Sequence, residues 1–148
     1  MRKVFLAIFA TLIMATVPAM AQRNIDLAMD PVLEADAKHN LDVASQYFKL
    51  KKAYKSVLMR FEETFAAYPQ FSRMDEFLYF AGMSSVYLSR NEGKQKVNLK
   101  MEKEKDKYAP EKLKQDAEAY LSMLIEKYPD SKYRADAEKT LKEIKPGS

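Results

Sequence analysis

The side chains that could perform chemistry are few in this sequence, and they do not converge. The only histidine is His39, beside Asn40, and the 148 residues include no cysteine. A lone histidine on the polar side of a helix is usually solvated. Without cysteine the chain has no thiolate to act as a nucleophile or a zinc ligand. We therefore predict neither a catalytic residue nor a metal site.

One adjacent pair of acids, Asp75 and Glu76, is also better explained by structure than by chemistry. Neighbouring residues on a helix point in different directions, so these two carboxylates cannot converge on a substrate. They fall in the first turn of a predicted helix, where the helix dipole favours negative charge. The sequence holds only three glycines and no glycine-rich phosphate loop. It predicts no enzyme activity and no cofactor.

The first 21 residues have the features of a signal peptide. Arg2 and Lys3 precede an apolar stretch, residues 4–17, and Ala19-Met20-Ala21 fits a cleavage site with small residues. The apolar stretch is shorter than the ~20 residues that span a bilayer, which argues against an uncleaved anchor. We expect cleavage before Gln22 and a soluble, exported protein.

Charge and composition argue against a nucleic-acid partner and favour helices. Cleavage would lower the formal charge from +4 to +2, because it removes two basic residues and no acidic ones. Nucleic-acid binding normally requires a concentrated basic face. Few glycines and many charged residues favour an all-α domain. We expect a flexible leader over residues 22–30, one helical domain over 31–145 and a tail over 146–148.

Apolar stripes and start signals define the first part of this domain. Asp30-Pro31 is a typical helix start, with aspartate as N-cap and proline at the first helical position. Apolar residues at helical spacing follow as far as Tyr68. The sequence leaves open whether residues 31–68 form one helix or two. We favour a turn near Lys51-Lys52, because a single helix of that length would be unusual.

Two Tyr-Pro pairs, Tyr68-Pro69 and Tyr128-Pro129, predict where helices end, because proline lacks an N–H and restricts the residue before it. Ser72 is the predicted N-cap of a third helix that runs to about Arg90, with Asn91 and Gly93 at its C-terminal end. A fourth helix should begin at Pro110. Asp130 or Ser131 is the predicted N-cap of the last helix.

The two Tyr-Pro pairs also reveal an internal repeat. An offset of 60 residues pairs them and keeps the apolar stripes before them in phase. A competing offset of 66 aligns residues 53–60 with 119–126 but loses the Tyr-Pro match. The first register therefore predicts a short array of helical hairpins, each burying its apolar face against the next.

At this level the chain resembles tetratricopeptide repeats, most closely those of the BamD family of outer-membrane assembly lipoproteins. The residues that carry the resemblance lie mostly at helix ends and corners: Leu41, Ala44, Tyr47-Phe48, Ala53-Tyr54, Tyr68-Pro69, Asp75-Glu76, Leu78, Tyr128-Pro129, Ser131, Tyr133 and Asp136-Ala137. The resemblance implies an all-α tetratricopeptide-like array of about two and a half repeats. The family's lipid-bearing cysteine has no counterpart here, so no stable lipid anchor is expected.

The resemblance also implies a function and a location. We expect a periplasmic protein–protein interaction scaffold, in outer-membrane protein assembly and peripheral to the outer membrane, that binds an envelope protein or peptide in a helical groove. One alternative is an accessory adaptor for another envelope or secretion complex. A second is a small exported ligand-binding protein. The sequence does not indicate the oligomeric state.

Residues 94–108 form a lysine-rich insertion with six lysines and three acids. Val97, Leu99 and Met101 alternate at a period of two, which is compatible with a brief extended segment. We expect a solvated loop. The alternative is an electrostatic contact with an acidic partner or an anionic lipid surface.

The third predicted helix carries apolar residues on two faces. Tyr79, Met83 and Tyr87 recur every four residues on the side opposite its main stripe. Aromatic residues and methionine are enriched in binding patches, and repeat arrays commonly bind partners in their groove. These three residues are therefore the candidate partner contacts. The alternative is that they pack against the first helix, residues 41–48.

Overall fold

The computed structural model describes residues 30–145, so the predicted signal peptide, most of the leader and the tail lie outside the described residues. Within this range all regular secondary structure is helical and no strand is present. The elements are α1 (Pro31–Gln46), the π-helix η1 (Tyr47–Lys51), α2 (Tyr54–Ala67), α3 (Met74–Ser89), α4 (Glu102–Tyr108), α5 (Pro110–Lys127) and α6 (Arg134–Ile144).

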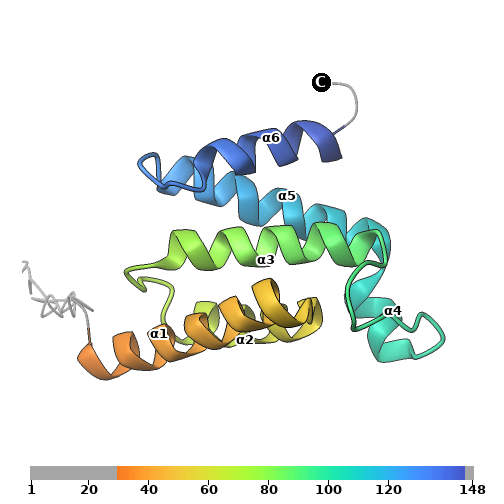
Figure 1. Cartoon of the computed structure of the whole chain (residues 1–148), viewed down its shortest axis with the longest axis horizontal. Coiled ribbons are helices and arrows are strands. Elements are labelled where there is room, and N and C mark those ends of the chain that lie inside the picture. Colours follow the sequence, from red (N-terminus) through yellow and green to blue (C-terminus); the bar gives the residue numbers. More distant parts are fainter. Residues whose placement is uncertain (1–29, 146–148) are drawn as a thin grey trace, which may run out of the picture.

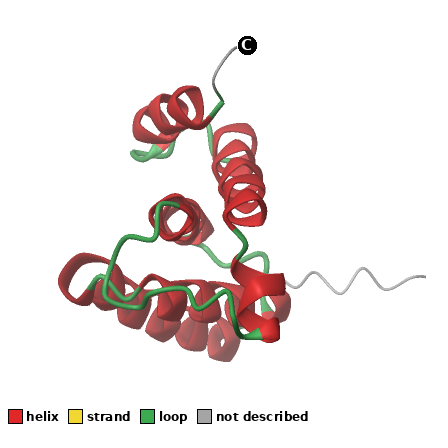
Figure 2. Cartoon of the chain, turned by 90° about the vertical axis from the view of Figure 1, so that its right-hand side faces the viewer, coloured by secondary structure: helices red, strands yellow, loops and turns green. Residues whose placement is uncertain are grey.

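The helices form successive antiparallel hairpins. Helix α2 packs against α1 and α3, and α5 packs against α3 and α6. In Figure 1, α1, α3 and α6 run in the same direction from left to right, and in the side view of Figure 2 α5 lies to the right of α3 and α6. Two hairpins, α1–α2 and α3–α5, are thus followed by a single closing helix. This arrangement confirms an all-α array of about two and a half repeats.

The predicted turn between the first two helices is also confirmed. The chain leaves α1 through the π-helical turn, after which Lys52 adopts a left-handed conformation with φ of 50°. The Ala53 N–H donates to the Tyr47 carbonyl at 3.0 Å, which closes the turn. Residues 31–68 therefore form two helices rather than one.

The two Tyr-Pro corners repeat the same backbone hydrogen bonds 60 positions apart, which confirms that register. In the first corner the Phe71 N–H donates to the Tyr68 carbonyl at 3.2 Å, and the Met74 N–H to the Phe71 carbonyl at 3.1 Å. The equivalent bonds of the second corner are Ser131 to Tyr128 at 3.0 Å and Arg134 to Ser131 at 3.1 Å.

Two of the predicted helix-end signals are confirmed. The Asp30 carboxylate caps α1 by accepting from the N–H of Val32 at 2.9 Å. At the end of α3, Asn91 has φ of 55°, and the Glu92 N–H donates to the Tyr87 carbonyl at 2.8 Å. These are the marks of a Schellman motif, which satisfies carbonyls that the helix leaves free.

The predicted N-caps of α3 and α6 are wrong. Helix α3 begins at Met74 without a side-chain cap, and the Ser72 hydroxyl donates to the Glu34 carboxylate on α1. Helix α6 begins at Arg134, later than expected, and neither Asp130 nor Ser131 caps it. The Ser131 hydroxyl donates to Asp75 on α3 at 2.6 Å. In both corners a serine ties the turn to the preceding repeat.

The lysine-rich insertion is not a loop throughout. It is irregular as far as Met101, without the brief extended strand that the alternation allowed, and then forms α4. This helix lies beside α5 and projects from the end where α3 finishes (Figure 1). Its last residue, Tyr108, is buried and anchors it to the core. Glutamate and lysine have good helix propensity, so α4 forms without an apolar stripe.

Close packing of α3 on α5 gives the domain its centre. Gly82 faces Leu121 of α5, and a β-carbon at this glycine would lie 2.6 Å from the Leu121 side chain. The glycine therefore lets the two helix backbones approach. Around this contact the predicted stripe of α3 is buried as expected: Phe77, Phe80, Ala81, Ser84 and Leu88.

Candidate functional site

The three candidate contact residues lie along one side of α3, which we call the α3 face: Tyr79, Met83 and Tyr87. All three are partly buried. Tyr79 stacks on Tyr133, with ring centroids 4.5 Å apart and an interplanar angle of 19°. The Met83 sulfur lies 3.5 Å from the hydroxyl of Thr140, which donates to it. The centre of the face therefore contacts α6.

The far end of the α3 face contacts the first hairpin. Tyr87 stacks on Tyr54 at the start of α2, with centroids 4.9 Å apart, and its ring lies 6.1 Å from that of Phe48 in η1. Of residues 41–48, the anticipated packing partner, only Phe48 makes a ring contact with the face. The three residues thus join both neighbouring repeats and leave part of each side chain exposed.

Aromatic residues from η1, α2, α3 and the turn before α6 extend this face into one cluster. Phe48 packs on Phe80 with centroids 4.9 Å apart, and Phe80 lies 6.1 Å from Tyr133. The Lys49 ammonium sits 5.1 Å from the Phe80 ring centre, a cation–π geometry. Sequence reasoning missed Phe48 and Tyr133 as members of the face, because helical spacing reports neighbours on one helix and not contacts between helices.

A network of charged and polar groups closes the N-terminal end of the face. The Arg73 guanidinium lies 2.5 Å from the Glu76 carboxylate and 3.9 Å from that of Asp42 on α1. Burial opposes ionisation of Glu76, but hydrogen bonds from Arg73 and Tyr133 outweigh it and lower the pKa of this carboxyl. Glu76 is therefore a buried carboxylate that links α3 to the start of α6.

The two tyrosines at this end keep their protons. Burial raises the pKa of Tyr79, and the nearby Asp136 carboxylate raises it further. Burial also raises the pKa of Tyr133, as does its hydrogen bond to Glu76. At neutral pH both hydroxyls are donors rather than charges. The arrangement offers aromatic surface edged by hydrogen-bond donors, which suits recognition of a polypeptide.

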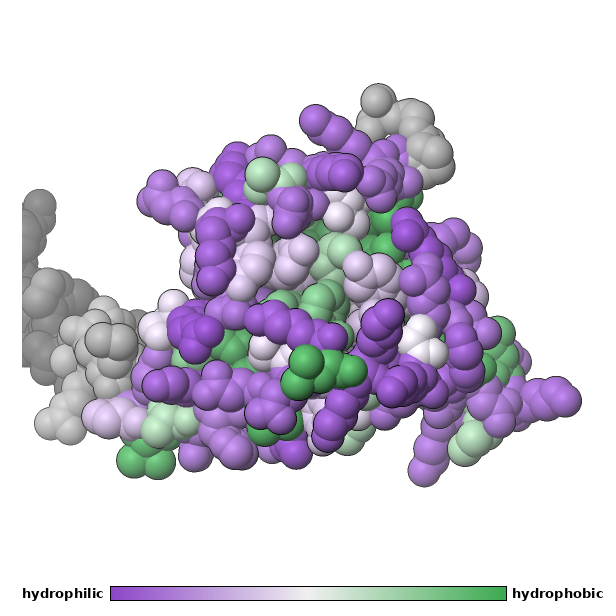
Figure 3. Space-filling model, in the orientation of Figure 1, coloured by the Kyte–Doolittle hydropathy of each residue, from purple (hydrophilic) through white to green (hydrophobic). Residues whose placement is uncertain are grey.

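The surface view agrees with this description. Figure 3, which looks onto α1, α3 and α6, shows pale and green side chains between the purple ridges of α1 below and α6 above. Less hydrophilic side chains are thus visible between α1 and α6 on this side of the molecule.

In the part of the chain that the structure describes, side chains capable of catalysis or metal binding do not come together elsewhere. Asp75 accepts from Ser131 while Glu76 accepts from Arg73, so the adjacent acids diverge as predicted. Within residues 30–145 no group of three or more histidine or acidic side chains is placed to hold a metal ion. None of the described helices is long and apolar enough to cross a bilayer.

A cavity of about 580 Å³ opens between η1, α2 and α4. Its lining mixes apolar, acidic and basic side chains: Tyr47, Ser56, Met59, Arg60, Glu62, Glu63 and Lys107. Ion pairs within the protein already engage several of them, including Lys107 with Glu62 at 2.5 Å and Arg60 with Glu63 at 3.0 Å. The cavity therefore offers few free charges to a ligand.

Comparison with known proteins gives one result. The family model described as YfiO, outer membrane lipoprotein, matches residues 28–147. No curated protein and no solved structure matches the chain significantly. The family match spans the whole helical array, including the insertion and both Tyr-Pro corners. The chain belongs to the YfiO outer membrane lipoprotein family.

Proposed function

We propose that this protein is a non-catalytic scaffold of the bacterial envelope that binds another envelope protein through the α3 face. The process that its family suggests is the assembly of outer-membrane proteins, and the corresponding location is the periplasm, peripheral to the outer membrane. The observation that carries the proposal is the partly exposed aromatic surface of Tyr79, Met83 and Tyr87 on the side formed by α1, α3 and α6.

The geometry favours an extended or helical polypeptide as the partner. The face runs along α3 from Tyr133 at one end to Tyr54 at the other, so it is elongated. Half-buried tyrosines supply large contact areas at low entropic cost, because neighbouring rings already restrict them. The Lys49 ammonium, which lies over the Phe80 ring, supplies a polar contact at the edge. The face is pre-organised, and binding would require little rearrangement.

The experiment is cross-linking of the exported protein in its native envelope, followed by identification of the captured proteins. Recovery of components that assemble outer-membrane β-barrels supports the proposal. Reproducible capture of a different envelope or secretion complex instead would establish the alternative role of an accessory adaptor. Ligand-induced thermal stabilisation by small metabolites, without any protein partner, would support the ligand-binding alternative.

The face itself is tested with substitutions that spare the fold. Tyr79→Phe and Tyr87→Phe keep the ring stacking and remove the hydroxyls, whereas Met83→Gln keeps the side-chain length and adds polarity. We expect weaker capture of the partner with thermal unfolding close to that of the wild type. If Tyr79→Ala and Tyr87→Ala unfold the domain while the conservative variants capture the partner normally, the face serves packing alone.

A further inference from the structure

The tip of the lysine-rich insertion presents an unusual exposed segment, residues 98–103. All six residues are exposed. Two of them are large and apolar: Leu99 is 48% exposed and Met101 is 53% exposed. Lys100 lies between them, and Glu102 and Lys103 follow. The segment therefore combines two exposed apolar side chains with two lysines and one acid.

The tip is held in one conformation by its own backbone. The Met101 N–H donates to the Asn98 carbonyl at 3.0 Å, which closes a β-turn with Leu99 and Lys100 at its centre. The Asn98 side chain accepts from the Lys100 N–H at 3.1 Å and reinforces the turn. The exposure of Leu99 is thus a property of an ordered turn.

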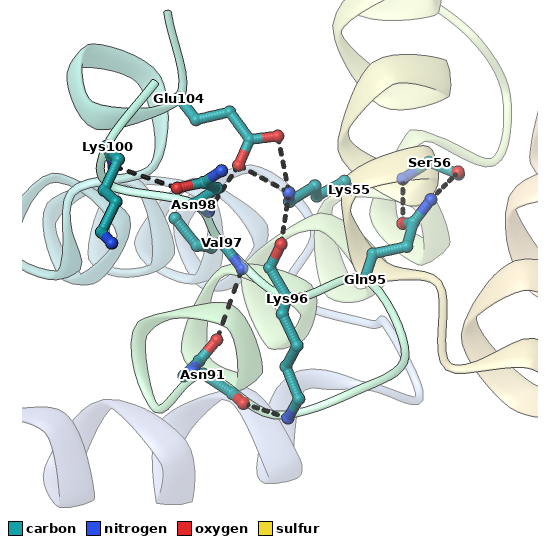
Figure 4. A network of polar contacts seen from close by, with 9 residues as sticks. All are labelled: Lys55, Ser56, Asn91, Gln95, Lys96, Val97, Asn98, Lys100 and Glu104. Carbon is teal, nitrogen blue, oxygen red and sulfur yellow. Dashed lines mark hydrogen bonds and ion pairs between the residues drawn. The ribbon is translucent and has the colours of Figure 1, made fainter. Parts of the chain in front are cut away.

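A polar network fastens this turn to the body of the protein (Figure 4). The Lys55 ammonium on α2 donates to the Glu104 carboxylate at 2.8 Å and to the Lys96 carbonyl at 2.7 Å. Glu104 also accepts from the Asn98 N–H at 2.6 Å. The Gln95 side-chain amide accepts from the Ser56 backbone N–H at 3.0 Å and donates to the Ser56 hydroxyl at 2.9 Å. The network directs the turn outward while its base stays fixed on α2.

Acidic side chains near the tip are partly paired. Glu104 is engaged by Lys55, and Glu102, itself in the tip, lies 3.9 Å from the Lys105 ammonium. The six lysines of residues 94–108 outnumber the three acids, so the insertion keeps a net positive charge. Within residues 30–145, Lys100 and Lys103 form no ion pair. A second cationic stretch, Lys49-Leu50-Lys51-Lys52, adjoins the insertion, because the Lys94 N–H donates to the Lys52 carbonyl at 2.9 Å.

We propose that residues 98–103 dock the protein reversibly onto an anionic phospholipid surface. Leu99 and Met101 would enter the interfacial layer, and Lys100 and Lys103 would contact lipid phosphates. Apolar side chains framed by lysines are the combination that such a surface binds, because burial and electrostatic attraction add there. An acidic protein surface would pair with the lysines but would offer no apolar layer to the two side chains between them.

Docking at this tip leaves the α3 face open. In Figure 1, α4 and the turn before it project at the lower right, whereas the side formed by α1, α3 and α6 is turned to the viewer. A surface that contacts the tip therefore does not cover Tyr79 or Met83. Membrane docking and partner binding are independent, and failure of one leaves the other standing.

The experiment is sedimentation of the exported protein, residues 22–148, with vesicles of phosphatidylcholine alone or with added phosphatidylglycerol. We expect binding only to the anionic vesicles, and weaker binding at high salt because screening shortens the electrostatic attraction. Leu99→Ser with Met101→Ser should weaken binding about tenfold or more. Lys100→Glu with Lys103→Glu should weaken it on the order of 100-fold.

Matched controls carry the same changes elsewhere on the surface. Val32→Ser alters an apolar side chain that is 68% exposed at the start of α1. Lys38→Glu with Lys139→Glu reverses two exposed lysines on α1 and α6. These controls should bind vesicles like the wild type, and all variants should retain the wild-type thermal unfolding. Absence of wild-type binding to anionic vesicles, or equal losses in the tip and control variants, would overturn the proposal.

Discussion

The two Tyr-Pro corners follow the same backbone path but bury different side chains. Tyr68 and Tyr128 end their helices at similar dihedral angles, with φ and ψ of −149° and 74° in the first and −128° and 67° in the second. In the first corner Phe71 and Met74 are buried. Their counterparts in the second corner are Ser131 and Arg134, which are only partly buried.

The difference follows from position in the array. The first corner leads into α3, which packs against α1, α2 and α5. The second leads into α6, which packs chiefly against α5 and is the last helix of the described residues. An internal repeat must fill space on several sides, whereas a terminal repeat keeps a solvated face. The two corners therefore share one backbone geometry, while the size of their buried side chains depends on how many helices pack around them.

The largest expected effect on stability is at a core-facing position of the helix that follows each corner. Phe77 is fully buried, and Phe77→Ala should lower the free energy of unfolding by about 3–5 kcal/mol, because it leaves a cavity. The equivalent residue of the second repeat is Ala137, where Ala137→Gly should cost only about 1 kcal/mol of helix propensity. Urea denaturation measures both. Equal losses at the two positions would remove the distinction between internal and terminal repeats.

A second effect concerns helix spacing. Gly82→Ala should destabilise the protein by about 1–3 kcal/mol, because the new methyl group would overlap the buried Leu121 side chain. The equivalent position of the last helix is Lys142, which is exposed. There, Lys142→Ala should change stability by no more than about 0.5 kcal/mol. Thermal unfolding of the two variants side by side checks this. A neutral Gly82→Ala would mean that the α3–α5 interface tolerates a wider separation.

A third effect is pH-dependent. The pKa of Glu76 is lowered in the folded protein from its ordinary value of 4.5, so its ionised form stabilises the fold at neutral pH. That stabilisation is lost as the pH falls from about 4.5 toward the lower folded pKa. Glu76→Gln should lower the free energy of unfolding by about 1–2 kcal/mol at pH 7. In this variant the free energy of unfolding should also fall less steeply below about pH 4.5 than in the wild type.

The matched change for Glu76 is Asp136→Asn, at the equivalent position of the exposed last helix. It should alter stability at pH 7 by no more than about 0.5 kcal/mol and leave the acid profile nearly unchanged. Denaturation at a series of pH values distinguishes the two variants. An unchanged acid profile in Glu76→Gln would contradict a stabilising role for the ionised carboxylate.

The smallest expected effect concerns the serines that tie each corner to the preceding repeat. Ser131→Ala removes a partly buried hydrogen bond to Asp75 and should cost about 1 kcal/mol. Ser72→Ala removes an exposed hydrogen bond to Glu34 and should cost about 0.5 kcal/mol. Precise urea midpoints can resolve this order. The reverse order would mean that the exposed tie is the stronger one.

Much of the fold could be predicted from single residues whose effect is local. Pro69 and Pro129 follow helix ends, Pro31 and Pro110 begin helices, and Asp30 and Asn91 act on the backbone next to them. The caps assigned to Ser72 and Ser131 were wrong because both helices begin later than expected, at Met74 and Arg134, so neither serine directly precedes its helix. Their hydroxyls donate to acids of the preceding repeat, a tertiary contact that sequence spacing does not show.

The same limit applies to the site. Helical spacing placed Tyr79, Met83 and Tyr87 on one face, but it could not show that α6 and the first hairpin contribute Tyr133, Tyr54 and Phe48. Helix α4 was missed for a related reason. The prediction relied on apolar stripes, whereas α4 is polar and is held by Lys55, by a pair between Lys107 and Glu62, and by buried Tyr108.

The most direct test of the proposed scaffold role is site-specific photocross-linking in the intact envelope. A photoreactive phenylalanine derivative would replace Met83 on the α3 face or, as the control, Ala119, an exposed residue of α5. We predict a discrete cross-linked protein from position 83 and none from position 119. Equal cross-linking from both positions, or none from position 83 in a folded and exported protein, would contradict the assignment of the α3 face as the binding surface.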